Sequence, residues 1–264
     1  MNRFAIFVDG SNLMGALKHL NIEIADYELL YRLIFEQAVQ KWQQNFYPKE
    51  KFSAQLLRVY WYALSEIDIY EFDNHQTNEN LKKQFLQNRD LKSKFMQEAG
   101  KKLPSAHTVQ VEQECFQLWI NDIKTWYDSK VRQVKGFNDF YYGLESSTEF
   151  IEVRRCGRWK VNLFDKVVEE KGVDTALAVD MVGLISEYDV ALLVSGDADS
   201  IPSLKYAKEK GRQVGVVDFI KGHPPEVKGR NFSMKLKPAA DFLVQIYQID
   251  LTRQEGLIKT AKKP

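Results

Sequence analysis

Residues 190–199 read VALLVSGDAD, and this sequence is the strongest indication of the fold class. Its first five residues are an unbroken apolar run, which is typical of a strand buried on both faces of a parallel sheet. Residues 3–12, RFAIFVDGSN, show the same pattern, in which an apolar run is followed by an aspartate and a glycine. Parallel strands end at the same edge of a sheet, where α/β folds bind ligands. Both stretches are therefore expected to deliver polar residues to one edge.

Apolar runs and helical periodicities alternate on either side of these two stretches. Further strands are predicted at 55–64, 149–155 and 213–217, and helices at 13–20, 27–44, 78–99, 175–187 and 200–210. Asp26 is predicted to cap the helix at 27–44. Residues 238–247 are expected to add one more element against the sheet. Because a helix connects parallel neighbours, this order predicts an α/β domain with a mainly parallel central sheet.

Residues 100–148 break the alternation and are interpreted as a helical insertion. An aromatic helix is predicted at 112–134, followed by the sequence GFNDFYYGLESS. Trp119, Ile123 and Trp126 share one face of this helix by their spacing. Such an apolar stripe must be covered, either by the body of the domain or by a second copy of the chain.

The composition excludes several classes of protein. The chain has 264 residues, with 37 Lys and Arg against 36 Asp and Glu, which is typical of a globular protein. We assign residues 1–247 to one domain and residues 248–264 to a basic C-terminal tail. Cys115 and Cys156 lack the spacing of a zinc site. No apolar run is long enough to cross a membrane and no signal peptide is recognised, so a cytoplasmic location is expected.

Four carboxylates are predicted to gather at the edge of the sheet where the strands end. Asp9 follows the first apolar run, and Asp197 and Asp199 follow VALLV. Asp174 lies at the start of the helix that leads into VALLV. Carboxylates in one crevice repel each other unless a cation offsets their charge. Oxygen ligands without histidine or cysteine favour Mg²⁺ or Mn²⁺, so the sequence predicts such a metal site.

Each aspartate also has a purely structural interpretation. Asp9 is compatible with a tight turn in which Ser11 caps the following helix. Asp174 and Asp199 are each placed to cap a helix. Asp180 falls on a different helix face from Asp174 and is interpreted as a structural partner instead of a ligand. The conjunction of four carboxylates at one edge favours the metal site over these separate interpretations.

Several motifs resemble those of the NYN domain, in the LabA-like group of the PIN-like nuclease superfamily. They are DGSN at 9–12, KGVDTALAVDM at 171–181, SGDAD at 195–199 and AADFL at 239–243. The resemblance covers residues 3–20, 55–64 and 149–247. Ser200 departs from it, since the family usually has an aromatic or aliphatic residue at that position.

The resemblance implies a Rossmann-like PIN/NYN fold, which is a three-layer α/β/α sandwich. It also implies a Mg²⁺- or Mn²⁺-dependent ribonuclease that hydrolyses single-stranded RNA. The residues that it implies as metal ligands and catalytic groups are Asp9, Asp174, Asp197 and Asp199, with Asn12 in support. Further candidates, for hydrogen bonds to a ligand or for phosphate contact, are Ser11, Ser195 and Lys171.

RNA would need basic residues near such a site, because a carboxylate pocket repels phosphate groups. Residues 221–237 follow the strand predicted at 213–217, and so begin at the same edge of the sheet as the acids. Lys221, Lys228 and Arg230 in this loop are the best candidates for phosphate contact.

Two other functions remain open as alternatives. A non-catalytic RNA-binding or regulatory scaffold would keep the fold without turnover. A Mg²⁺-dependent phosphatase of the haloacid-dehalogenase type needs a second aspartate two residues after the first, where this chain has Ser11. A homodimer is an open alternative for the oligomeric state.

Overall fold

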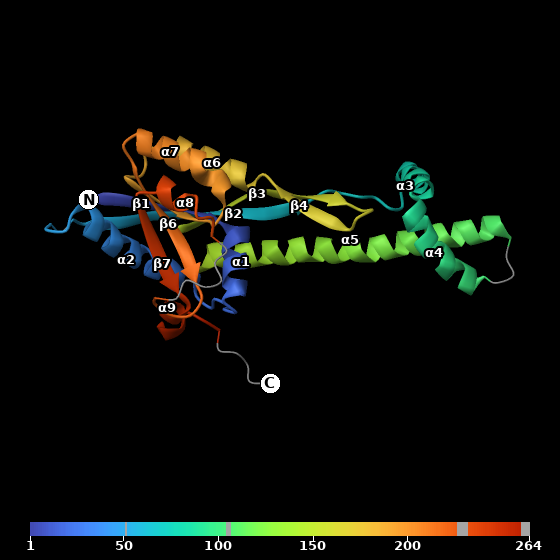
Figure 1. Ribbon diagram of the computed structural model, residues 1–264, viewed down its shortest axis with the longest axis horizontal. Helices are drawn as coiled ribbons and strands as arrows, with labels where there is room; N and C mark the ends of the chain where they lie inside the picture. Colours follow the sequence, from blue (N-terminus) through green and yellow to red (C-terminus); the bar gives the residue numbers. More distant parts are fainter. Residues whose placement is uncertain (51, 104–106, 226–231, 260–264) are drawn as a thin grey trace. The chain divides into compact units, whose positions relative to one another are not determined.

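The computed structural model describes residues 1–50, 52–103, 107–225 and 232–259 (Figure 1). The chain divides into two compact units. Unit 1 consists of Met1–Ser65, Asn138–Arg158 and Lys171–Pro264, and unit 2 of Glu66–Phe137 and Trp159–Glu170. All four aspartates of the predicted site belong to unit 1.

The strands form one sheet with mainly parallel pairing. They are β1 (Asn2–Asp9), β2 (Ala54–Ile67), β3 (Ile151–Asn162), β4 (Val167–Lys171), β5 (Val190–Val194), β6 (Gln213–Ile220) and β7 (Phe242–Tyr247). Their order in the sheet is β4-β3-β2-β1-β5-β6-β7. Strand β1 pairs in parallel with β2 and β5, and parallel pairing continues from β5 to β6 and from β6 to β7. The predicted α/β fold with a mainly parallel sheet is confirmed, and β1, β5 and β6 end at one edge.

Helices cover both faces of the sheet in unit 1. The helices of the chain are α1 (Gly10–His19), α2 (Tyr27–Phe46), α3 (His75–Gln87), α4 (Arg89–Lys102), α5 (Thr108–Ser147), α6 (Val173–Gly183), α7 (Ile201–Glu209), α8 (Leu236–Ala239) and α9 (Gln248–Arg253), with a 3₁₀ turn η1 (Ala198–Ser200). Figure 1 shows α1 and α2 on one face of the sheet and α6 and α7 on the other. Asp26 caps α2 as predicted, because its carboxylate accepts from the backbone N–H of Leu29.

Strand β1 shows why the decisive stretches are apolar throughout. Phe4, Ile6 and Val8 belong to the hydrophobic core beneath α1 and α2. Ala5 and Phe7 belong to the core beneath α6 and α7. Successive side chains of a strand point to opposite faces, so a strand covered on both faces must be apolar at every position.

Unit 2 has a hydrophobic core of its own, which covers the aromatic stripe of α5. Trp119 and Ile123 are buried in this core, and Trp126 packs partly against it. The ring of Trp119 stacks on that of Phe85 from α3, with centroids 4.8 Å apart. Of the two alternatives for covering this apolar stripe, the structure therefore shows that the chain itself covers Trp119 and Ile123.

The prediction of a single basic helix at 78–99 is wrong. The structure has two helices, α3 and α4, with Asn88 between them. Asn88 closes α3, and its side chain accepts from the backbone N–H of Leu91 and so caps α4. Short polar side chains such as that of asparagine are favoured at helix caps and disfavoured in helix interiors. The apolar periodicity continues across Asn88, so it did not indicate the break between the two helices.

Other boundaries also differ from the expectation. Helix α5 is longer than the predicted 112–134, because the sequence GFNDFYYGLESS is helical. Its glycines are Gly136 and Gly143, neither of which breaks the helix. Residues 100–148 contribute to both units. The sequence does not predict strand β4, because VVEEK is short and three of its five residues are charged.

Candidate active site

Asp9 ends β1 and at the same time begins α1. It is the N-cap of the helix, and its Oδ1 accepts from the backbone N–H of Asn12 at 2.9 Å. A side chain at Gly10 would place Cβ 2.3 Å from Nε1 of Trp61, so only glycine lets α1 begin this close to β2. The interpretation of this stretch as a tight turn capped by Ser11 is therefore wrong. Only 6% of Asp9 is exposed, and the fold holds its carboxylate in one place.

Ser195 connects Asp9 to the loop that follows β5. The register pairs Val8 with Val194, so the next residues, Asp9 and Ser195, are neighbours at the strand ends. The Ser195 hydroxyl donates to Oδ2 of Asp9 at 3.4 Å and accepts from the backbone N–H of Asp197 at 3.1 Å. A buried hydroxyl thus links the first predicted carboxylate to the backbone of the third.

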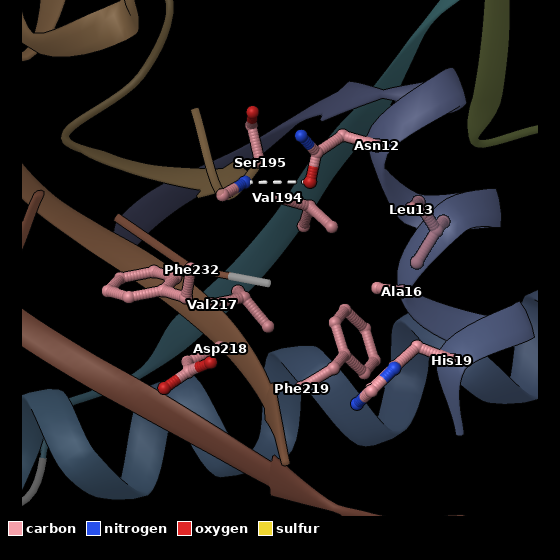
Figure 2. Close-up of a pocket in the computed structure, with 11 residues that line it drawn as sticks. Asn12, Leu13, Ala16, His19, Val194, Ser195, Val217, Asp218, Phe219 and Phe232 are labelled. Carbon is pink, nitrogen blue, oxygen red and sulfur yellow. Dashed lines mark hydrogen bonds between the residues drawn. The ribbon is translucent and has the colours of Figure 1, made fainter. Parts of the chain in front are cut away.

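Asn12 makes a second connection between α1 and the same loop. Its Oδ1 accepts from the backbone N–H of Gly196 at 2.8 Å, as Figure 2 shows. The two partners lie 184 positions apart in the sequence. Together with Ser195, Asn12 ties the loop after β5 to the junction of β1 and α1.

Asp197 and Asp199 lie on the exposed side of this loop. Asp197 is the N-cap of η1, and its Oδ1 accepts from the backbone N–H of Asp199 at 3.2 Å. The alternative in which Asp199 caps the next helix is not what the structure shows, because Asp197 has the capping role and Ser200 precedes α7. Both carboxylates face solvent, where they can meet a ligand.

Asp174 lies in the first turn of α6, and the residue that caps this helix is Gly172. Gly172 has a φ of 99°, and a side chain there would come within 2.7 Å of the backbone oxygen of Cys156. Burial raises the pKa of the Asp174 carboxyl above its usual range, and the negative charges of Asp197 and Asp199 raise it further. The charges of Asp197 and Asp199 are therefore close enough to act on Asp174.

The structure does not bring the four aspartates into one coordination shell. In the part of the chain that is described, no group of three or more His, Cys, Asp or Glu side chains is arranged to hold a metal ion. The donor chemistry nevertheless suits a hard cation, since the neighbouring carboxylates Asp174, Asp197 and Asp199 supply oxygen atoms only. Binding of an ion would have to draw these side chains together.

Asp218 is a carboxylate at the same edge that the sequence analysis missed. Leu193 pairs with Val216, so the register two residues further on places Asp218 beside Ser195. Only 1% of Asp218 is exposed. It lines a cavity of about 20 Å³ together with Asn12 and Ser195, enough for about one water molecule (Figure 2). The detectable signal was one acidic residue within the apolar strand VVDFI.

Asp180 is engaged by an arginine, as its structural interpretation requires. Nη1 of Arg154 forms an ion pair with Oδ2 of Asp180. The guanidinium of Arg154 also lies over the ring of Tyr60, 4.6 Å from its centroid. Burial raises the pKa of Tyr62, and the charge of Asp180 raises it further. Asp180 therefore serves the packing between α6 and the sheet.

Some of the remaining predicted site residues lie within the described part of the chain, and others lie outside it. Ser11, Lys171 and Lys221 have exposed side chains. Lys221 directly follows β6, at the edge where the loop was expected to begin. Lys228 and Arg230 lie outside the described residues, so their predicted contact with RNA stays a prediction.

Part of the chain that contains most of the candidate site matches a known protein family. The NYN domain model matches residues 120–244, a stretch that contains Asp174, Asp197 and Asp199. This stretch of the chain is similar to the NYN domain. NYN domains belong to a PIN-like nuclease superfamily, which makes a hydrolase the coarse functional class. The match leaves out β1, so the place of Asp9 and Asn12 beside the NYN motifs comes from the structure.

Two further comparisons add little to the NYN assignment. A crystal structure of a protein of unknown function from Vibrio parahaemolyticus is similar at 12% sequence identity, with a TM-score of 0.42. The alignment covers 98% of this chain and 96% of the other. The comparison with curated proteins gave no match.

Within the described residues, no helix has the length and apolar character needed to span a membrane.

Proposed function

We propose that the NYN domain hydrolyses phosphodiester bonds of single-stranded RNA with Mg²⁺ or Mn²⁺ at the four aspartates. The observation that carries this proposal is the placement of Asp174 near Asp197 and Asp199, where burial, and then the charges of the two other aspartates, raise the pKa of the Asp174 carboxyl. Unpaired like charges at a sheet edge are costly, and a divalent cation removes the cost. Asp9 is connected to this group through Ser195.

The residues present fit a hard divalent ion through their donor atoms. Carboxylate oxygens from Asp9, Asp174, Asp197 and Asp199 would hold it. When bound, such an ion activates a water molecule and offsets the charge that develops on the phosphodiester. Asp9 would contribute a carboxylate whose orientation is already determined, because Asn12 N–H and the Ser195 hydroxyl each hold one of its oxygens.

Hydrolysis requires water as the only co-reactant. The water oxygen forms a bond to phosphorus while the bond from phosphorus to the 3′ oxygen breaks, which leaves a 5′-phosphate and a 3′-hydroxyl. The water gives up one proton, and the leaving 3′ oxygen gains one. A carboxylate near the attacking water can accept the first proton.

The test replaces two of the carboxylates by their amides. Asp9→Asn and Asp197→Asn are each expected to abolish cleavage of single-stranded RNA by purified protein in Mn²⁺, while circular dichroism shows the fold retained. Asp139→Asn, on the exposed surface of α5 in unit 1, is the matched control and should cleave normally. Chelation by EDTA should stop cleavage of the wild type.

Thermal denaturation separates metal binding from turnover. Mn²⁺ should raise the Tm of the wild type, because a ligand that binds only the folded state stabilises it. The two Asp→Asn variants should show a smaller rise. Mn²⁺ binding without any RNA cleavage would favour the alternative of a regulatory scaffold, and an unchanged Tm at millimolar Mn²⁺ would contradict the metal site.

A further inference from the structure

The orientation of the Asn12 amide is determined by its partner. Oδ1 of Asn12 lies 2.8 Å from the backbone nitrogen of Gly196. A backbone N–H only donates, so the Asn12 atom that it meets must be the carbonyl oxygen. The two ends of an asparagine amide are otherwise easily exchanged, and here hydrogen-bond chemistry allows one assignment. The NH₂ group of Asn12 must therefore point the other way.

The NH₂ group of Asn12 is available to a ligand. Within the described residues, the hydrogen bonds of Asn12 use its backbone N–H and Oδ1 and none uses Nδ2, and the residue is half-buried. Figure 2 shows this nitrogen on the side of the Ser195 hydroxyl, whereas Ala16 and Phe219 lie on the other side. The Ser195 hydroxyl in turn donates to Asp9. The NH₂ group thus lies at the border of the proposed acidic site.

Asn12 is also held at two points before any ligand arrives. Its backbone N–H donates to Oδ1 of Asp9 at 2.9 Å, and its side-chain oxygen accepts from Gly196. A donor that is already oriented costs little conformational entropy when it binds. The carbonyl oxygen is the only atom of the side chain that a metal ion would accept as a ligand, and one of its two lone pairs is already engaged by a protein N–H.

We propose that Asn12 donates a hydrogen bond to a non-bridging phosphate oxygen of the RNA and is not an oxygen ligand of the metal. This inference rests on the proposed function and assigns a substrate contact within the same site. Phosphate oxygens accept hydrogen bonds, and a neutral amide can approach them amid carboxylates that repel them. A donor of this kind lowers the barrier if its bond strengthens as charge develops on the phosphate.

Asn12→Asp is the discriminating variant, because it has the same shape. The new carboxylate still accepts from Gly196 N–H, but an oxygen replaces the NH₂ group. We expect the Mn²⁺ affinity of the RNA-free protein, measured by calorimetric titration, to be retained or increased. We expect kcat/KM on single-stranded RNA to fall by at least about tenfold, as for loss of an oriented donor.

Asn80→Asp is the matched control. Its side-chain oxygen also accepts a hydrogen bond, from Nε2 of Gln76, and it lies in unit 2, away from the acidic motifs in the sequence. This variant carries the same change of charge and should retain both Mn²⁺ affinity and kcat/KM. The Tm of each variant shows whether the fold survives.

The outcomes separate this inference from the proposed function. An Asn12→Asp protein that cleaves RNA as fast as the wild type overturns the inference alone. Loss of Mn²⁺ affinity in a folded Asn12→Asp protein also overturns it, because Asn12 would then belong to the metal ligands. A wild type that neither binds Mn²⁺ nor cleaves RNA overturns the proposed function, and the inference with it.

Discussion

Gly172 shows how a single residue determines the place of a candidate metal ligand. Its φ of 99° lies in the left-handed region, which residues with a Cβ rarely adopt. The backbone oxygen of Cys156 also occupies the space that a side chain would need. Because Gly172 caps α6, any adjustment there moves the first turn of the helix, which carries Asp174.

Gly172→Ala is therefore expected to weaken both the fold and the site. The free energy of unfolding should fall by about 2 kcal/mol, from left-handed strain and the contact with Cys156. Mn²⁺ affinity should fall as well. Gly183→Ala, at the other end of α6 with no atom near its Cβ, is the control and should change stability by less than about 1 kcal/mol. Urea denaturation and calorimetric titration measure the two effects, and equal behaviour of both variants would contradict the argument.

Among the secondary-structure elements, Asp189 joins three neighbouring strands at the edge opposite to the site. It immediately precedes β5, and its Oδ2 accepts from the backbone N–H of Arg3 in β1 at 2.8 Å. Nη1 of Arg212, which precedes β6, lies 3.3 Å from its Oδ1. Burial alone would raise the pKa of Asp189, but the hydrogen bonds and charge of Arg3, with the charge of Arg212, lower it overall.

This lowered pKa predicts a stabilisation that depends on pH. Because the folded-state pKa of Asp189 lies below its unfolded value, the stabilisation is present above the unfolded value of about 3.9 and is lost as the pH falls through the folded value. Asp189→Asn should lower the free energy of unfolding by about 1 kcal/mol at pH 7, since the pair is partly exposed. The difference from the wild type should vanish in acid. Chemical denaturation from pH 7 to pH 2 measures it, and a difference that persists at the acid end would contradict the assignment.

The hydrophobic core of unit 2 and the proposed catalytic residues belong to different units of the chain. The core of unit 2 consists of residues from that unit alone, and the predicted ligands lie in unit 1. Trp119 is the largest fully buried side chain of the unit 2 core and contacts the rings of Phe85 and Phe164. We therefore expect that a substitution in the core of unit 2 can lower the stability of unit 2 without changing the metal affinity of unit 1.

Trp119→Ala tests this separation. The cavity that it leaves should lower the free energy of unfolding of unit 2 by about 3 to 5 kcal/mol. Hydrogen exchange should become faster in unit 2, while the Mn²⁺ affinity stays that of the wild type. Val109→Ala in the same helix is the control, because Val109 is 66% exposed and its loss should have little effect. Reduced Mn²⁺ affinity in a Trp119→Ala protein whose unit 1 keeps its exchange protection would show that unit 2 supports the ligands.

Most elements of unit 1, and the edge of the sheet at which the candidate site lies, could be predicted from the amino-acid sequence alone. The strand predicted at 190–194 has the bounds of β5, and Asp26 caps α2 as expected. These features depend on residues that are close along the chain, such as an unbroken apolar run or a cap beside a helical period. They are readable without knowledge of distant partners.

Which polar groups meet depends on the three-dimensional fold. Asp9 and Ser195 lie 186 positions apart, and no local pattern indicates that the hydroxyl of one donates to the carboxylate of the other. Asp180 is distinguished from Asp174 by its arginine partner, and Asp218 joins the edge only through the register of β5 and β6. The physical reason is that hydrogen bonds, ion pairs and raised pKa values depend on distances in space, which the order of residues does not contain.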